Sequence, residues 1–252
     1  MTDEAWWAAG LALLSLGLGV GWPWLRARNR SWQKLDEQWP GRAARFFYFV
    51  GLPYLAVISG VLSTRLLGLK GLEYFLLIDV GAALQSGRLV AEIQYASLLM
   101  LLEWFIDSSS TIGASLVALM VLAGVTLGLA RAGVVVAGDL GTTPVGIIYY
   151  GLHWAFYRAI FWLISGDFYL GVVWGAALVI LETMLVARVQ RNWHEQQSRF
   201  LLTSIILILT GTVFFYSPNL WLLWLVHGGM VALVRRLGVV DIGREISQVN
   251  LA

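Results

Sequence analysis

Long apolar runs, each close to the length that crosses a bilayer, recur throughout this sequence of 252 residues. A transmembrane helix needs about 20 predominantly apolar residues. Runs of this kind predict spans at residues 5–24, 46–63, 89–106, 112–130, 145–164, 168–187, 200–216 and 220–234. We therefore expect an all-α protein, a polytopic transmembrane helix bundle of about eight long spans.

The composition supports this interpretation, because 59% of the residues are hydrophobic and only 13% are charged. A water-soluble domain carries about 45–50% apolar and about 25% charged residues. The chain has no cysteine, which excludes disulfides and cysteine-ligated metals. The formal net charge of +2 is assigned to cytoplasmic loops, and no nucleic-acid partner is expected.

A ninth stretch, residues 72–84, is apolar but short and contains Glu73 and Asp79. It is open to interpretation as an interfacial segment, a re-entrant segment or a short crossing. The basic loop 26–45 should be cytoplasmic, because Lys and Arg are enriched in cytoplasmic loops. Only an extra crossing at 72–84 then places the later arginine clusters on the same side as this loop. We therefore favour the crossing, with the N-terminus outside and the C-terminus in the cytoplasm of a bacterial inner membrane.

The chain is predicted to form a single membrane domain, 1–252, with N-terminal helices over 1–110. Its first span begins with acidic residues, Asp3 and Glu4, and is interpreted as a retained helix. The polar run SSST, residues 108–111, is expected to separate the third and fourth spans and to cap the fourth.

Four ionisable residues are predicted to lie at membrane depth: His153, Arg158, Glu182 and His227. A charged residue at the centre of a membrane helix costs about 2.5–3.5 kcal/mol on insertion scales, so each is a candidate functional residue. Convergence of the two histidines and the glutamate would build a metal site or an acid–base site. The alternative is a structural cluster, with Arg158 paired to Glu182 and neutral histidines bonded between helices. Trp154, four residues before Arg158, is expected to stack on its guanidinium.

Three short segments around these residues resemble the motifs of the CAAX protease and bacteriocin-processing (CPBP) family of intramembrane proteases. HWAFYR (153–158) stands where the family has EExxxR, LVILE (178–182) where it has FxxxH, and HGGMV (227–231) where it has HxxxN. The resemblance covers residues 145–237 and implies the core of an eight-helix bundle. In the family a glutamate activates the water that attacks a peptide bond, aided by histidines and an oxyanion-stabilising asparagine.

The motifs here are degenerate, because both motif glutamates are replaced, by His153 and Trp154, and the final asparagine is Val231. The resemblance therefore implies a non-catalytic accessory or structural subunit of a membrane complex, whose partners are the bilayer and other integral membrane subunits. The alternative is an atypical intramembrane peptidase, with Glu182, His153, His227 and Arg158 as its catalytic residues. A third hypothesis makes His153 and His227 axial ligands of a haem or chlorin. We expect no cofactor and no metal.

Overall fold

The computed structural model describes residues 3–132, 143–190 and 193–237. Every regular element within these ranges is helical, which confirms the predicted all-α class. In chain order the elements are α1 (Asp3–Arg28), α2 (Arg30–Glu37), α3 (Trp39–Phe46), the π-helix η1 (Phe47–Gly51), α4 (Leu52–Ile58), α5 (Leu72–Leu76), α6 (Val80–Gln85), α7 (Leu89–Arg131), α8 (Pro144–Ser165), α9 (Phe168–Val189), α10 (Trp193–Tyr216) and α11 (Leu220–Arg236).

Within the described residues, three helices are long and apolar enough to cross a membrane, not about eight. They are α1, α7 and α9. One cause of the difference is α7, whose 43 residues join two predicted spans, 89–106 and 112–130, in one helix. Another is the predicted span 46–63, which is divided between the end of α3, η1 and α4.

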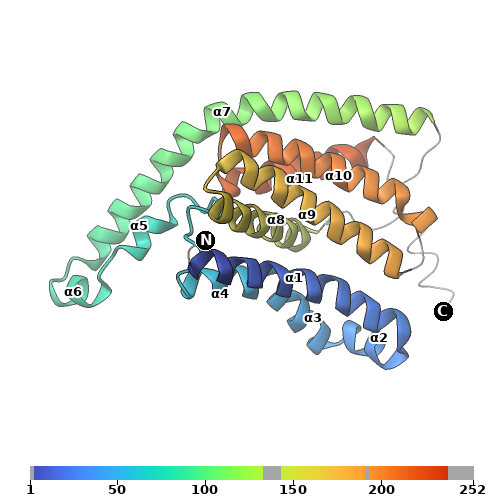
Figure 1. Ribbon diagram of the computed structural model, residues 1–252. Helices are drawn as coiled ribbons and strands as arrows, with labels where there is room; N and C mark the ends of the chain where they lie inside the picture. Colours follow the sequence, from blue (N-terminus) through green and yellow to red (C-terminus); the bar gives the residue numbers. More distant parts are fainter. Residues whose placement is uncertain (1–2, 133–142, 191–192, 238–252) are drawn as a thin grey trace.

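The polar run at 108–111 lies inside α7 and does not cap a helix. Its hydroxyls bond to carbonyls of the preceding turn: Ser108 Oγ donates to Trp104 O at 2.6 Å, and Thr111 Oγ1 donates to Asp107 O at 2.8 Å. Such bonds satisfy the hydroxyls within the helix and often accompany helix bending. The helix indeed bends where it leaves the bundle (Figure 1).

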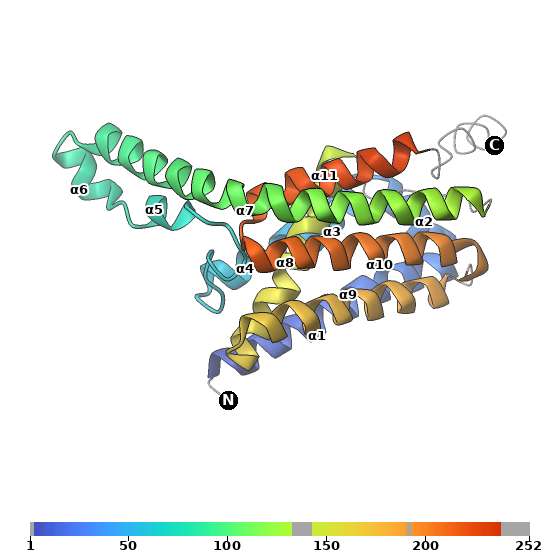
Figure 2. The same cartoon turned by 90° about the horizontal axis from the view of Figure 1, so that it is seen from above.

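The first half of α7 forms an arm with α5 and α6, and this arm projects away from the other helices (Figures 1 and 2). Helix α5 has five residues and α6 has six, so neither is long enough to cross a bilayer. Both pack against α7. The favoured crossing at 72–84 is therefore wrong, since this segment is part of the arm.

A polar cluster fastens the arm to the bundle. Lys70 Nζ lies 3.0 Å from both carboxylate oxygens of Asp107, and Asn219 Nδ2 donates to Asp107 Oδ2 at 3.0 Å. The indole N–H groups of Trp104 and Trp221 both donate to the carbonyl of Lys70, at 3.3 and 3.1 Å. The start of the arm, the middle of α7 and the α10–α11 turn are thus bonded to one another.

Helix α8 lies at the centre of the bundle, in contact with α1, α9 and α11. Eight consecutive residues, 153–160, are buried, as expected for a helix that is covered on every side. Helix α9 approaches α8 closely because Gly171 and Gly175 have no side chain. A Cβ on Gly175 would lie 2.7 Å from the backbone nitrogen of Arg158. This four-residue spacing of glycines is typical of tightly packed membrane helices.

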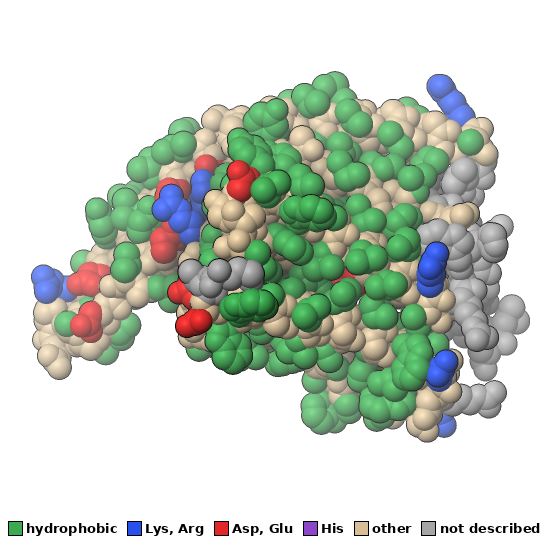
Figure 3. Space-filling model, viewed as in Figure 1, with side chains coloured by type: hydrophobic (Ala, Val, Ile, Leu, Met, Phe, Trp, Pro, Cys, Tyr) green, Lys and Arg blue, Asp and Glu red, His purple; other side chains and the backbone are tan. Residues whose placement is uncertain are grey.

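The outer surface is largely apolar, with hydrophobic side chains covering most of the face shown in Figure 3. Exposed large hydrophobic residues occur along α1, α7 and α9, the three helices suited to a bilayer. Basic residues occupy the last turns of these helices and of α11. These four helix ends lie at the same end of the bundle, away from the arm (Figures 1 and 2).

Candidate functional site

A cavity of about 560 Å³ lies between the helices that surround the middle of α8 and α9. Its volume falls within the range of small-molecule pockets, about 300–1,000 Å³. Three of the four residues predicted to converge, His153, Glu182 and His227, line it, whereas Arg158 does not. The remaining walls are mainly apolar and aromatic, and are formed by residues such as Leu18, Phe47, Phe49, Trp154, Val179, Val186 and Ile206.

Glu182 is the centre of the polar part of the cavity wall. Its Oε2 lies 3.1 Å from Nε2 of His153 and accepts a hydrogen bond from the hydroxyl of Tyr157 at 2.7 Å. Its Oε1 accepts a hydrogen bond from the hydroxyl of Tyr48. The two carboxylate oxygens therefore have three partners on η1 and α8.

Two further contacts hold this cluster in place. The Tyr48 hydroxyl also lies 2.9 Å from Nε2 of His153, and the Tyr157 hydroxyl lies within hydrogen-bond distance of Ser15 Oγ of α1, at 3.1 Å. Helix α1 comes close at Gly19, where a Cβ would clash with the Glu182 carboxylate and the Tyr48 hydroxyl. Neither tyrosine was expected from the sequence. Tyr157 had a signal, because it is four residues after His153 and shares its helix face.

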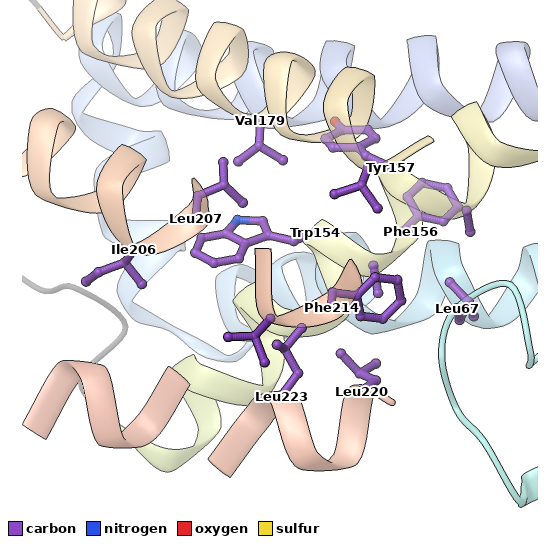
Figure 4. Close-up of a cluster of buried hydrophobic side chains, with 14 of the residues drawn as sticks. Leu67, Trp154, Phe156, Tyr157, Val179, Ile206, Leu207, Phe214, Leu220 and Leu223 are labelled. Atoms are coloured by element: carbon purple, nitrogen blue, oxygen red, sulfur yellow. The ribbon is translucent and has the colours of Figure 1, made fainter. Parts of the chain in front are cut away.

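His227 occupies a different part of the cavity wall and is 4% exposed. Both of its ring nitrogens are buried and lack a hydrogen-bond partner among the described residues. The indole of Trp154 packs edge-on against it, with ring centroids 5.2 Å apart. Val179 of α9 and Leu207 of α10 lie on one side of the same indole (Figure 4). Trp154 thus occupies the volume between the histidine and the apolar wall.

Arg158 does not take either of its predicted partners. Its guanidinium stacks on Phe214 of α10, with Cζ 3.9 Å from the ring centroid, and not on Trp154. It forms no ion pair with Glu182, and its three side-chain nitrogens have no hydrogen-bond partner within the described ranges. The predicted Arg158–Glu182 pair is therefore wrong, because the carboxylate is already held by His153 and two tyrosines.

At the basic end of the bundle the cavity is lined by Arg26 of α1, Asp36 of α2 and Arg45 of α3, and the two arginine side chains are partly exposed. We call this end the mouth of the cavity. Asp36 is 6% exposed and bonds to Arg26 Nη1 at 2.5 Å, while Arg45 Nη2 lies 3.5 Å from its carboxylate. Trp22 Nε1 donates to Asp36 Oδ1 at 2.9 Å. Burial raises the pKa of Asp36, but the hydrogen bonds from Trp22 and Arg26 and the charges of Arg45 and Arg26 outweigh it. The pKa is therefore lowered, and the carboxylate is stabilised in its charged form.

These groups provide hydrogen bonding and charge at two levels of one pocket. Within the part of the chain that the structure describes, no three His, Asp or Glu side chains are grouped so as to hold a metal ion. The His153 ring presents Nε2 to Glu182 and Tyr48, and its Nδ1 is buried without a partner in the described segments. Comparisons of the chain with protein-family models, with curated proteins and with solved structures find no match.

Proposed function

We propose that this protein is a non-catalytic membrane subunit that binds an amphipathic ligand in its central cavity, within a CPBP-like arrangement of helices. The observation that carries the proposal is the engagement of Glu182. Its two carboxylate oxygens receive three hydrogen-bonding partners, so it acts as a fixed acceptor that joins η1, α8 and α9. A general base must instead reach a substrate proton or water at about 2.6–3.2 Å.

The positions of the motif-like residues support the resemblance to the CPBP family. His153, Glu182 and His227 come from α8, α9 and α11, and all three line one cavity. The replacement of a motif glutamate by Trp154 supports the non-catalytic interpretation. Its indole packs edge-on against His227 and takes up volume beside this histidine.

We further propose that the N-terminus lies outside and the C-terminus in the cytoplasm. The passages through the bilayer would be α1, the helical stretch 39–58, the second half of α7, α8, α9, α10 and α11, which makes seven. An odd number of passages places the two ends of the chain on opposite sides of the bilayer. The supporting observation is that the basic last turns of α1, α7, α9 and α11 share one end, as the positive-inside rule requires.

Other integral membrane subunits are the proposed partners. Large side chains such as Trp6, Trp7 and Phe105 are well exposed, at 66%, 70% and 78%. Aromatic residues of this size provide rigid apolar contact area for a neighbouring helix. Mild-detergent purification followed by chemical crosslinking tests this, and recovery of only a solitary monomer would contradict it.

The non-catalytic assignment is tested with proteoliposomes that contain a lipidated reporter peptide. The wild type, Glu182→Gln and His227→Ala should all leave the peptide intact. Binding should be measured in the same samples, as the quenching of tryptophan fluorescence by a brominated phospholipid. We expect this quenching to fall in the Val186→Trp variant, because the larger side chain narrows the cavity.

The second candidate is the atypical peptidase, and the open cavity favours it, because a carboxylate and two imidazoles line the same space. Cleavage by the wild type that is lost in Glu182→Gln would establish this alternative and refute the non-catalytic assignment.

A further inference from the structure

The mouth of the cavity carries more positive than negative charge. Arg26 and Arg45 both face the single carboxylate of Asp36, and all three residues line the cavity. The two arginine side chains are 38% and 51% exposed, whereas the Asp36 side chain is 8% exposed. The negative charge is therefore buried behind two accessible cations.

Most of the hydrogen-bond donors of these arginines have no partner among the residues that the structure describes. Each guanidinium has five N–H donors in a planar fork. Arg26 bonds to the Asp36 carboxylate through Nη1 alone. Arg45 bonds to the backbone carbonyl of Asp36 through Nη2 alone, at 2.8 Å. A planar fork of this kind suits phosphate oxygens, which it can bind through two parallel hydrogen bonds.

Apolar side chains also line the cavity between the arginines and the Glu182 cluster. Val186, Ala187 and Leu18 contribute to its walls beneath the mouth, together with aromatic rings from η1. Trp22 lines the mouth itself and packs edge-on against Trp32 of α2, with centroids 5.4 Å apart. Tryptophan is enriched at the level of lipid headgroups, so the mouth has the composition of the membrane interface.

We infer that the cavity binds an anionic phospholipid from the leaflet at the basic end of the bundle. Its phosphate lies between the guanidinium groups of Arg26 and Arg45, and the first part of an acyl chain fills the apolar space below. This inference rests on the proposed binding function and names the class of ligand. Asp36 acts as a positioning residue, because its bonds to both arginines fix the distance between them.

The experiment measures lipid binding by native mass spectrometry on delipidated full-length protein. The two probes are dioleoylphosphatidylglycerol, which is anionic, and dioleoylphosphatidylcholine, which is zwitterionic. The phosphate group and the chains are identical in the two lipids, but the choline of the zwitterionic lipid carries a positive charge that the two arginines repel. The wild type should therefore bind the anionic lipid about tenfold more tightly. Equal affinity for the two lipids would overturn the inference.

A matched pair of double variants separates the mouth from general charge attraction. Arg26→Gln/Arg45→Gln should weaken binding of the anionic lipid about tenfold, because both phosphate contacts are lost. Arg28→Gln/Arg42→Gln removes the same charge from residues that do not line the cavity, and should change the affinity less than about twofold under the same salt screening. Equal losses in the two variants would overturn the inference.

Two further measurements make the outcome unambiguous. The Arg26→Gln/Arg45→Gln variant leaves the buried Asp36 carboxylate unpaired, which could disturb folding. Adding Asp36→Asn removes that charge. If this triple variant also loses binding of the anionic lipid, the loss is not caused by misfolding. Free glycerol phosphate should not displace the lipid at equal concentration, and full displacement would identify a water-soluble phosphate as the ligand. If both phospholipids bind equally and Val186→Trp abolishes both, the cavity still binds lipid, and only the preference for an anionic headgroup fails.

Discussion

Tyr48 of η1 donates a hydrogen bond to Glu182 of α9, across a separation of 134 positions in the sequence. The bond joins η1, which follows the basic loop 26–45, to α9. Helix α9 is the helix that packs most closely against the central α8. His153 of α8 completes the contact, with Nε2 at 2.9 Å from the tyrosine and 3.1 Å from the carboxylate. The carboxylate of Glu182 therefore links three helical segments, η1, α8 and α9, through hydrogen bonds.

Removal of this bond should destabilise the protein without affecting any hydrolytic activity. Tyr48→Phe is expected to lower the free energy of unfolding by about 1–3 kcal/mol, because the hydrogen bond goes to a charged, buried acceptor. Thermal unfolding in detergent measures the effect. Tyr54→Phe is the control, since Tyr54 is 63% exposed on α4, and an equal loss in both variants would contradict the structural role of Tyr48.

Gly175→Ala should destabilise the α8–α9 contact. The added Cβ would lie 2.7 Å from the backbone nitrogen of Arg158, and backbone cannot yield as a flexible side chain can. Such overpacking costs about 1–3 kcal/mol. Gly113→Ala on α7 is the matched control, because a Cβ there has no neighbour within 4 Å and alanine favours the helix. A melting temperature that is unchanged in Gly175→Ala would refute the close approach.

The packing of α2 against α1 should weaken in acid. The pKa of Asp36 is held below its ordinary value near 3.8, so its charged form is stabilised by folding. This contribution is fully present above the ordinary pKa and is lost as the pH falls through the lowered value in the folded protein. Unfolding of the wild type should therefore become easier below about pH 4, whereas Asp36→Asn should show a flatter pH dependence. Melting temperatures at pH 3 to 6 measure this, and parallel curves would contradict it.

Arg158→Met should leave stability unchanged or raise it. The guanidinium is 3% exposed and finds no hydrogen-bond acceptor among the described residues, and an unsatisfied buried polar group costs about 1–3 kcal/mol. Methionine retains much of the apolar contact with Phe214. Phe214→Leu, by contrast, should lower the melting temperature, because Phe214 is 1% exposed and its ring fills core volume. A large destabilisation in Arg158→Met would indicate an acceptor bound to Arg158.

The sequence predicts the helical class because apolar runs of bilayer length have few other structures open to them. It also places His153, Glu182 and His227 in the interior, since ionisable groups in apolar helices face inward, and all three line one cavity. The single helix α7 could not be predicted in this way. The polar run 108–111 has the composition of a helix break, but α7 continues through it, with its hydroxyls bonded to carbonyls of the preceding turn.

The remaining errors concern partners and not positions. Arg158 and Glu182 have opposite charges on neighbouring helices, so a salt bridge between them is the simplest prediction from sequence. The tyrosines that hold Glu182 instead are a frequent residue type in membrane helices and carry no distinguishing pattern at Tyr48. The pairing of Tyr48 with Glu182 lies where α1 comes close at Gly19. This contact joins parts of the chain that are far apart in sequence, so it has no local sequence signal.

The continuity of α7 has a mechanical consequence. The same helix forms the arm and also packs against α10 and α11, which contribute Ile206 and His227 to the cavity wall. Near the middle of α7, Asp107 bonds to Lys70 and Asn219, and these bonds hold this part of the helix in place. A movement of the arm would therefore pass along α7 to two helices that line the cavity.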